Sequence, residues 1–299
     1  SEYYANIFTA YKDELIGAVG TFFNQSGRKY EFTISVNDVD VYTQTGVSKL
    51  GGYETIKLDK LVQIKKGDKF KVTFKNMVYV AHNLRIHTQS GQSFVSDNTK
   101  EWEDLSKVYF VAILKAYTVS DLNITSSLVK YYKNDTPFVA KVGAGENVTF
   151  QFKGIDYTVK ADENGFAKLN ITSGPGKYSI TTIYNGTSIV NYIIIKNTVI
   201  SSNVERGYNS NYNYKLKVVD SAGNPLKNTY VKISLNNGKY KNYKSDKTGY
   251  VTIKFTKLTK KQTIKVKNPS TGEVKTTTIK VVSRFSSASN IVMYYFDGS

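Results

Sequence analysis

Cysteine is absent from this chain of 299 residues, and its absence excludes several kinds of chemistry. Disulfides, thiolate zinc sites, iron–sulfur clusters and cysteine nucleophiles all require the thiol. The G-x-S-x-G motif of serine hydrolases is also missing. Histidine occurs only at His82 and His87, whose offset places them on opposite faces of a regular strand. We therefore expect a protein that is not an enzyme and that has no bound metal at its histidines.

Arginine supplies only four of the 41 basic residues. The planar guanidinium group, which reads phosphates and base edges through paired hydrogen bonds, is therefore mostly missing. No known nucleic-acid-binding motif is present either, so we expect no nucleic-acid partner. The chain also lacks a run of about 18 apolar residues, the length that a membrane-spanning helix needs. We expect no membrane-spanning segment in this chain.

The residues that are abundant favour β-strands. The chain holds 24 Tyr and 15 Phe, and 40% of it is hydrophobic, which is too much for a disordered protein. Tyr, Thr, Val and Ile are common, whereas the helix formers Ala, Leu, Met and Gln are scarce. The composition therefore predicts an all-β protein.

Alternating hydrophobic residues locate several of these strands. One set includes Phe32 and Ile34, another includes Phe70 and Val72, and a third includes Val231. Such alternation is typical of strands with one buried face. Turn signals such as Asn-Gly recur about every 8 to 12 residues, which is the spacing of an antiparallel sandwich. Residues 11–19 have charges that suit a helix, but their β-prone neighbours favour a loop that leads into a strand.

The second half of the chain contains an internal repeat. The segments 162–166, DENGF, and 246–250, DKTGY, each follow one predicted strand and precede another, 84 residues apart. The repeats occupy 121–198 and 199–284. Modules of about 80 residues with this alternation fit immunoglobulin-like sandwiches of seven strands, although the cysteine pair and core Trp of antibody domains are missing.

A third copy of the repeat begins within residues 285–299 and then stops. The segment 289–297, SNIVMYYFD, is similar to 127–135, SLVKYYKND, the opening strand of the first copy. One interpretation is that the chain is a piece of a longer array. The other is that the orphan strand pairs with the sheet edge of a neighbouring molecule. In that case Ile291, Met293 and Tyr295 are the candidate exchanged side chains.

The net charge of +17 is concentrated in the last third of the chain. Lys plus Arg against Asp plus Glu is 15 against 13 in residues 1–118, 8 against 6 in 119–199, and 18 against 5 in 200–299. These segments therefore carry +2, +2 and +13. The basic module favours contact with an anionic wall polymer, or it is an ordinary solvated surface.

The two repeats resemble the immunoglobulin-like modules of adhesin-like surface proteins of methanogenic archaea. Four motifs carry the resemblance, in the family's order: KYYKN, SAGNPLKN, DENGFAKL and GPGKYSITTIYNG. The first module lacks the long turn SAGNPLKN, and the second has KLTKKQTIKV in place of the GKYSITTIY segment. The resemblance implies a location outside the cell, at its surface.

Residues 1–118 resemble the lectin-like domain that follows papain-like cysteine peptidase domains in secreted proteins. The matching segments include ANIFTAYKDELIGAVGTFF at 5–23 and GGYETIKLDKLVQIKKGDKFKVTF at 51–74, followed by GQSFVSDNTKEWEDL at 91–105. The resemblance implies a jelly-roll-like β-sandwich. It also implies a role in sugar binding, although the family's own sugar binding is inferred from its shape.

The only tryptophan, Trp102, is the centre of a candidate glycan site, because a sugar ring stacks its CH face on an exposed aromatic ring. We place Tyr79, Asn83, Arg85 and Gln92 with it. The alternative is that Trp102 closes one end of the sandwich as a core residue, as large aromatic residues usually do.

Acidic loop residues and glycosylation sequons complete the set of candidate sites. Oxygen ligands from Asp38 and Asp40, with Asp97, Glu103 and Asp104 on a later loop, suit calcium, or they are solvated turn residues. The N-x-[ST] sequons are Asn24, Asn123, Asn134, Asn147, Asn170 and Asn185. Five of the six lie in the first repeat, which suggests a glycosylated spacer.

These observations favour an extracellular, adhesin-like protein at the cell surface that is not an enzyme. Residues 1–118 would bind a ligand, most readily a glycan, and the two modules would hold this part away from the cell. One alternative is a structural subunit of a filament that assembles through strand 289–297. Another is the accessory region of a secreted cysteine peptidase.

Overall fold

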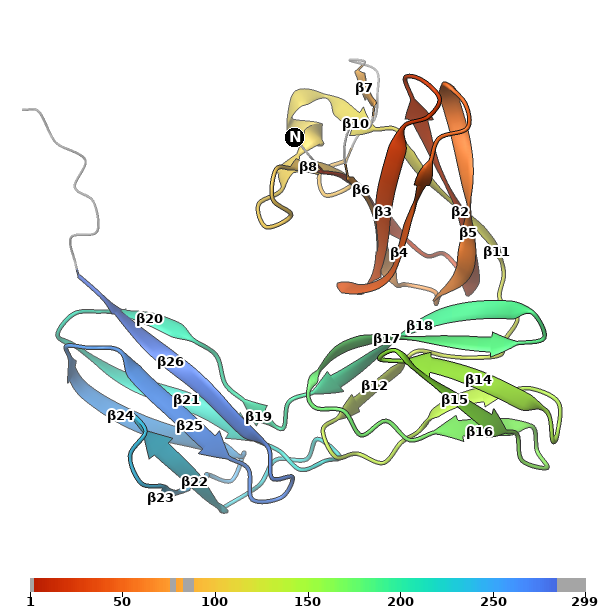
Figure 1. Cartoon of the computed structure of the whole chain (residues 1–299). Helices are drawn as coiled ribbons and strands as arrows, with labels where there is room; N and C mark the ends of the chain where they lie inside the picture. Colours follow the sequence, from red (N-terminus) through yellow and green to blue (C-terminus); the bar gives the residue numbers. More distant parts are fainter. Residues whose placement is uncertain (1–2, 76–78, 83–88, 284–299) are drawn as a thin grey trace, which may run out of the picture. The chain divides into compact units, whose positions relative to one another are not determined.

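The computed structural model describes residues 3–75, 79–82 and 89–283, and divides the chain into two compact units. One unit is Ser1–Val129 with Asp135–Ile194, and the other is Lys130–Asn134 with Ile195–Ser299. Within the described ranges all regular structure is strand, apart from one short 3-10 helix, η1, at Leu105–Val108 (Figure 1). The all-β fold predicted from the sequence is confirmed.

Strands β1 to β11 form the N-terminal sandwich. One of its sheets has the strand order β4-β3-β6-β1-β8-β9, and a second sheet begins with β11-β2-β5 (Figure 1). The strands are β1 (Tyr3–Thr9), β2 (Glu14–Phe23), β3 (Lys29–Val36), β4 (Val39–Val47), β5 (Gly52–Ile64), β6 (Lys69–Lys75), β8 (Ser93–Ser96), β9 (Glu103–Asp104) and β11 (Leu114–Ser120). A separate ribbon pairs β7 (Val80–His82) with β10 (Phe110–Ala112).

The alternation in β3 and β6 explains how this sandwich packs. Phe32, Ile34 and Val72 are buried in a shared core, where the rings of Phe32 and Phe74 stack with 5.2 Å between centroids. Because neighbouring side chains on a strand point to opposite faces, the residues between them form a polar outer face. Residues 11–19 are confirmed as a loop that leads into β2.

The second sheet continues from the N-terminal sandwich into the first repeat. β5 pairs in parallel with β18 through Leu61 opposite Ile189 and Val62 opposite Val190. The whole sheet has eight strands in the order β11-β2-β5-β18-β17-β14-β15, with β12 also on β18. The strands of the repeat are β12 (Leu128–Tyr131), β13 (Phe138–Lys141), β14 (Asn147–Phe152), β15 (Ile155–Lys160), β16 (Phe166–Leu169), β17 (Gly176–Tyr184) and β18 (Thr187–Lys196). We call this repeat module 1.

The second repeat, module 2, is built of two sheets. β19-β21-β24 form one and β20-β26-β25-β22-β23 the other (Figure 1). Their bounds are β19 (Val199–Ile200), β20 (Val204–Gly207), β21 (Ser210–Val218), β22 (Tyr230–Leu235), β23 (Lys241–Lys244), β24 (Tyr250–Leu258), β25 (Gln262–Lys267) and β26 (Val274–Val282). Leu216, Ile233, Ile253 and Ile264 lie in the core between the sheets, as the alternation predicts. The predicted orphan strand, 289–297, lies outside the described residues.

The two repeats share a turn that has the same hydrogen bonds in each module. The Asp162 side chain accepts from the backbone N–H of Asn164 and Phe166, both at 2.9 Å. Asp246 accepts in the same way from Thr248 and Tyr250, at 2.7 and 3.0 Å. The glycine of each turn has a positive φ, +81° and +84°, which side chains rarely adopt. The repeat found in the sequence is therefore repeated in the hydrogen bonds of the backbone.

Candidate ligand-binding groove

The outer face of the six-stranded sheet presents rows of polar side chains. Register places Glu31 of β3 opposite Lys75 of β6, and Lys75 opposite Tyr3 of β1. In the next row Thr33 lies opposite Thr73. Since paired residues in an antiparallel sheet share a face, these side chains line one surface. This surface combines hydroxyl groups, charges of both signs and an aromatic ring.

A rigid loop places Trp102 over this surface. Ser96 Oγ accepts from the backbone N–H of Thr99 at 2.9 Å, and Asn98 Oδ1 accepts from that of Glu101 at 3.0 Å. The indole Nε1 of Trp102 donates to the carbonyl of Thr99 at 3.1 Å. The ammonium of Lys71 lies 5.2 Å from the centre of the indole ring, which is within cation–π range. Trp102 is therefore partly exposed and held in one orientation.

The Trp102 side chain borders a cavity of about 190 Å³. The other lining residues come from the polar rows of the sheet and from the loop: Tyr3, Glu31, Thr33, Asp40, Lys71, Thr73, Lys75 and Thr99. An indole beside hydroxyl, ammonium and carboxylate groups suits a sugar ring, because sugars have apolar CH faces and polar edges. We call this the Trp102 cavity.

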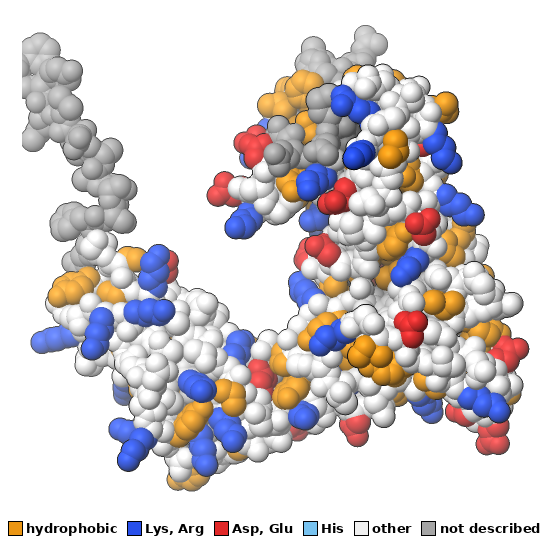
Figure 2. Space-filling view, viewed as in Figure 1, with side chains coloured by type: hydrophobic (Ala, Val, Ile, Leu, Met, Phe, Trp, Pro, Cys, Tyr) orange, Lys and Arg blue, Asp and Glu red, His pale blue; other side chains and the backbone are white. Residues whose placement is uncertain are grey.

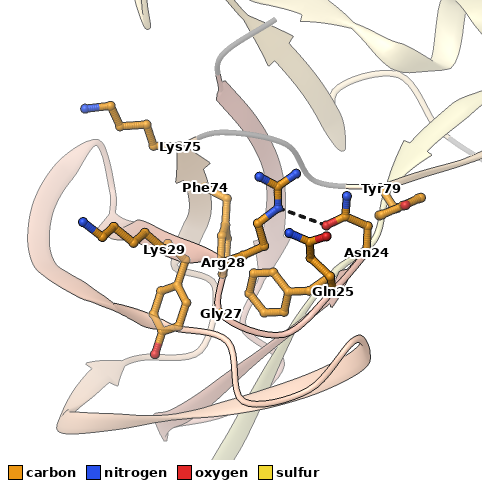
Figure 3. Close-up of a pocket in the computed structure, with 10 residues that line it drawn as sticks. Asn24, Gln25, Gly27, Arg28, Lys29, Phe74, Lys75 and Tyr79 are labelled. Atoms are coloured by element: carbon orange, nitrogen blue, oxygen red, sulfur yellow. Dashed lines mark hydrogen bonds between the residues drawn. The ribbon is translucent and has the colours of Figure 1, made fainter.

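A larger cavity, of about 540 Å³, lies at one end of the same sheet (Figure 3). Asn24, Gln25 and Arg28 come from the loop between β2 and β3, and Figure 3 shows Tyr79 next to Asn24, with Lys29 and Lys75 on the opposite side. Arg28 Nε donates to Asn24 Oδ1 at 3.1 Å, which fixes the guanidinium group beside the amide. The cavity therefore offers an aromatic ring, an amide and a guanidinium group within one hollow.

A third cavity, of about 400 Å³, shares walls with both. Lys75 lines all three cavities, Glu31 also lines the Trp102 cavity, and Lys29 also lines the larger one. We call these three cavities, which share Lys75, the sheet groove. Neighbouring cavities suit a ligand of several units better than a single small molecule.

Asp104 ties together two loops beside the Trp102 loop. Its carboxylate accepts from the Ser90 hydroxyl at 2.7 Å and from the backbone N–H of Gly91 and Ser106 at 2.9 and 3.0 Å. Desolvation opposes ionisation, but these hydrogen bonds outweigh it and hold the pKa of Asp104 well below its usual range. Asp104 has a structural role, because its side chain caps the N-terminus of η1.

The structure separates two residues that the sequence grouped together. Trp102 lines the cavity above the sheet, whereas Tyr79 lines the larger cavity, where its ring meets Phe22 edge to face at 5.0 Å. The backbone carbonyl of Gln92 accepts from Ile7 at 2.8 Å, and its side chain faces solvent. Asn83 and Arg85 lie outside the described residues, as do His87, Ile291, Met293 and Tyr295.

The sequence alone did not indicate the groove's other residues. Lys71, Lys75 and Glu31 belong to strands whose alternation was visible, so their exposure could be predicted. Their position next to Trp102 depends on which strands are neighbours, and sequence alternation carries no signal for that.

Two of the acidic residues considered for calcium, Asp40 and Asp104, accept hydrogen bonds from different parts of the chain. Asp40 accepts from the Ser35 hydroxyl, and Asp104 is used as described above. Among the described residues, His, Asp and Glu form no group of three or more that could hold a metal ion. Calcium binding at the acidic residues stays a prediction.

Five sequon asparagines are exposed, namely Asn24, Asn123, Asn147, Asn170 and Asn185. Asn134 is half-buried, and its amide nitrogen donates to the carbonyl of Ser221 at 3.0 Å. Glycosylation would replace one hydrogen of this nitrogen and displace the contact.

We therefore expect Asn134 to have the lowest glycan occupancy of the six sequons when the chain is made by a cell that glycosylates them. Peptide mass spectrometry measures occupancy at each site, with Asn147 and Asn185 as exposed references in the same module. Full occupancy at Asn134 would contradict the expectation.

Comparison with known families gives one match, to the family described as lectin-like domain, over residues 1–118. The N-terminal sandwich is a lectin-like domain. The match ends where module 1 is about to begin, as the sequence resemblance implied. No curated protein matches the chain.

Solved structures with some similarity include repeated domains and surface proteins. An I9–I11 tandem from titin is 11% identical, with 88% of this chain and 95% of that chain covered and a TM-score of 0.30. A bacterial ice-binding adhesin is 9% identical, with coverage of 95% and 99% and a TM-score of 0.20. SGBP-B of Bacteroides ovatus, in complex with a mixed-linkage heptasaccharide, is 12% identical, with coverage of 88% and 65% and a TM-score of 0.23. These scores are too low to support an argument about function.

The described residues contain no helix with the length and apolar character needed to cross a bilayer.

Proposed function

We propose that this protein acts outside the cell, at its surface, as a carbohydrate-binding, adhesin-like protein without enzymatic activity. The lectin-like domain would hold the ligand in the sheet groove, and modules 1 and 2 would serve as spacers. The single observation that carries the proposal is Trp102, a partly exposed ring held over polar side chains.

The chemistry of the Trp102 cavity supports this ligand class. One face of a pyranose ring consists of CH groups, which pack on an indole. Its hydroxyl groups need donors and acceptors at the rim, and Lys71, Glu31 and Thr33 supply both. Because the Lys71 ammonium lies 5.2 Å from the centre of the indole ring, a sugar that packs on the opposite face or edge of the ring would have an ammonium group nearby. The cavity therefore suits a sugar unit with a carboxylate or several hydroxyl groups.

We expect Trp102→Ala to lower affinity for the sugar that a glycan array selects by about 30-fold, which is about 2 kcal/mol. The melting temperature should change little, because the indole is partly exposed and its one hydrogen bond lies within its own loop. Tyr11→Ala is the matched control, since this ring is 91% exposed and lies outside the groove.

Two outcomes would contradict the proposal. If the affinity for the sugar is unchanged in Trp102→Ala, the sugar does not bind in the sheet groove. A large fall in the melting temperature that accompanies the loss of sugar binding would show that Trp102 is a structural residue. Trp102→Phe keeps an aromatic face, and we expect it to retain part of the affinity.

A further inference from the structure

Module 2 has few acidic residues, and its structure uses each of the described ones locally. Asp220 and Asp246 accept backbone N–H groups within their own turns. Glu273 is 5% exposed and accepts from Thr198 and Val199. Glu205 pairs with Lys280 at 2.7 Å. Among the described residues of module 2, Lys280 is therefore the only lysine that forms an ion pair with a carboxylate.

Strand register gathers four of the other lysines on one sheet face. Lys232 of β22 lies directly opposite Lys267 of β25. Lys265 is two residues from Lys267 and therefore on the same face, and Lys244 of β23 is opposite Tyr230, which is two residues from Lys232. All four are exposed. We call Lys232, Lys244, Lys265 and Lys267 the lysine face.

The lysine face is electrostatically unfavourable in the isolated protein. Like charges directly opposite each other on a sheet destabilise it, because their side chains lie close together. A solvated surface avoids this cost by alternating charge signs or by placing Thr opposite Lys, as this sheet does where Thr276 faces Lys265. The Lys232–Lys267 pair therefore needs an explanation outside the fold. Figure 2 shows many basic and few acidic side chains on the visible side of this module.

We propose that the lysine face is a second binding site, for an acidic polysaccharide whose carboxylate, sulfate or phosphate groups lie along the sheet. Anionic groups relieve the repulsion between opposed lysines. The close approach of the lysines is unfavourable in the free protein and favours binding of an anionic ligand. Thr263, Thr276 and Thr278 lie on the same face and offer hydroxyl groups to the sugar hydroxyls.

Two other polyanions fit this face less well. The recognition of nucleic-acid bases favours Arg and aromatic stacking, whereas the lysine face has no Arg and only one exposed ring beside it, that of Tyr230. Peripheral membrane binding normally adds apolar side chains that enter the interface, and lysines and threonines dominate this face. A flat row of ammonium and hydroxyl groups matches a linear acidic sugar chain.

The test uses the full chain with K232Q, K244Q, K265Q and K267Q combined. Its matched control carries K215Q, K217Q, K247Q and K254Q. Of these, Lys215, Lys217 and Lys254 lie on the outer face of the opposite sheet, on β21 and β24. Both variants lose four positive charges, so they differ only in where the charge is removed. The probes are polygalacturonate, dextran sulfate, neutral dextran, phosphatidylglycerol vesicles and duplex DNA, each measured at low and at physiological salt.

We expect the first variant to bind polygalacturonate and dextran sulfate about tenfold more weakly than the unchanged chain, and the control about twofold more weakly. Neutral dextran should bind neither variant. Equal losses in both variants would show an effect of net charge alone and overturn the site. Stronger binding to vesicles or DNA than to the acidic polysaccharides would overturn the ligand class. The four substitutions should weaken binding by the same factor in a chain that also carries Trp102→Ala, which separates the site from the sheet groove.

Discussion

We expect Glu273→Ala to lower the free energy of unfolding of module 2 by about 4 kcal/mol. One oxygen of Glu273 accepts from the backbone N–H of Thr198 at 2.5 Å, from that of Val199 at 3.0 Å and from the Thr198 hydroxyl at 2.6 Å. Thr198 and Val199 are fully buried, so no water can replace the lost acceptor easily. Each unsatisfied buried N–H costs about 1 to 3 kcal/mol.

The carboxylate of Glu273 does not act alone. Asn268, which is also fully buried, donates to the carbonyl of Thr198 at 3.1 Å and to that of Val219 at 2.8 Å. Together Glu273 and Asn268 fix the segment that enters module 2. Glu273→Gln keeps one acceptor oxygen at the same place, and we expect it to lose about half as much stability as Glu273→Ala.

Hydrogen exchange measures this effect within module 2. Fluorescence of the single Trp would report only on the lectin-like domain, because Trp102 lies there. We expect the backbone N–H groups of β21 and β24 to exchange faster in Glu273→Ala, while those of β3 and β6 keep their rates. Unchanged exchange of Thr198 and Val199 would show that the side chain contributes little.

The second large effect concerns the buried amides where the lectin-like domain meets module 1. Asn191 donates to Gln63 Oε1 at 2.5 Å and accepts from the Thr125 hydroxyl at 2.7 Å. Gln63 Nε2 in turn donates to the Thr125 carbonyl at 2.6 Å. Asn191→Ala leaves Gln63 and Thr125 with unmet hydrogen bonds in a buried place, and we expect a loss of about 3 kcal/mol.

A double-mutant cycle tests this network. Asn191→Leu and Gln63→Leu should each be destabilising, whereas the double variant should recover part of the loss, because both partners of the buried amide contact are then apolar. Asn170→Ala is the control, since that side chain is exposed and in the same module. Urea unfolding followed by Trp102 fluorescence measures the lectin-like domain. Strictly additive losses would show that the two amides are not coupled.

Much of the fold could be predicted from the sequence, because alternation is a local property. The buried faces of β3, β6, β22 and β24 follow from side-chain order alone. The repeated Asp turns were also visible, because Asp and Gly stand at fixed positions in them. The partners of each strand were not predictable, because pairing depends on contacts between residues far apart in sequence.

The candidate site shows the same division. Trp102 was identified because a single Trp in a loop is conspicuous, but Lys71 and Tyr3 reach it only through the order of strands β6 and β1. Glu273 looks like an ordinary surface acid in a lysine-rich segment, and Asn191 lies within an apolar run. Their burial follows from hydrogen-bond partners that come from other parts of the chain.

The pairing of β5 with β18 has a mechanical consequence. The chain between β11 and β12 connects the lectin-like domain to module 1, and the strand pair through Leu61 and Val62 joins them a second way, beside side-chain contacts such as that of Asn37 with Tyr192. A pulling force between them would be opposed by the paired strands and by the buried amides, which also hold Thr125 of the connecting segment. The chain between β11 and β12 can extend only after these contacts break. The junction would then resist extension up to a threshold force, and above that force the segment between β11 and β12 would lengthen.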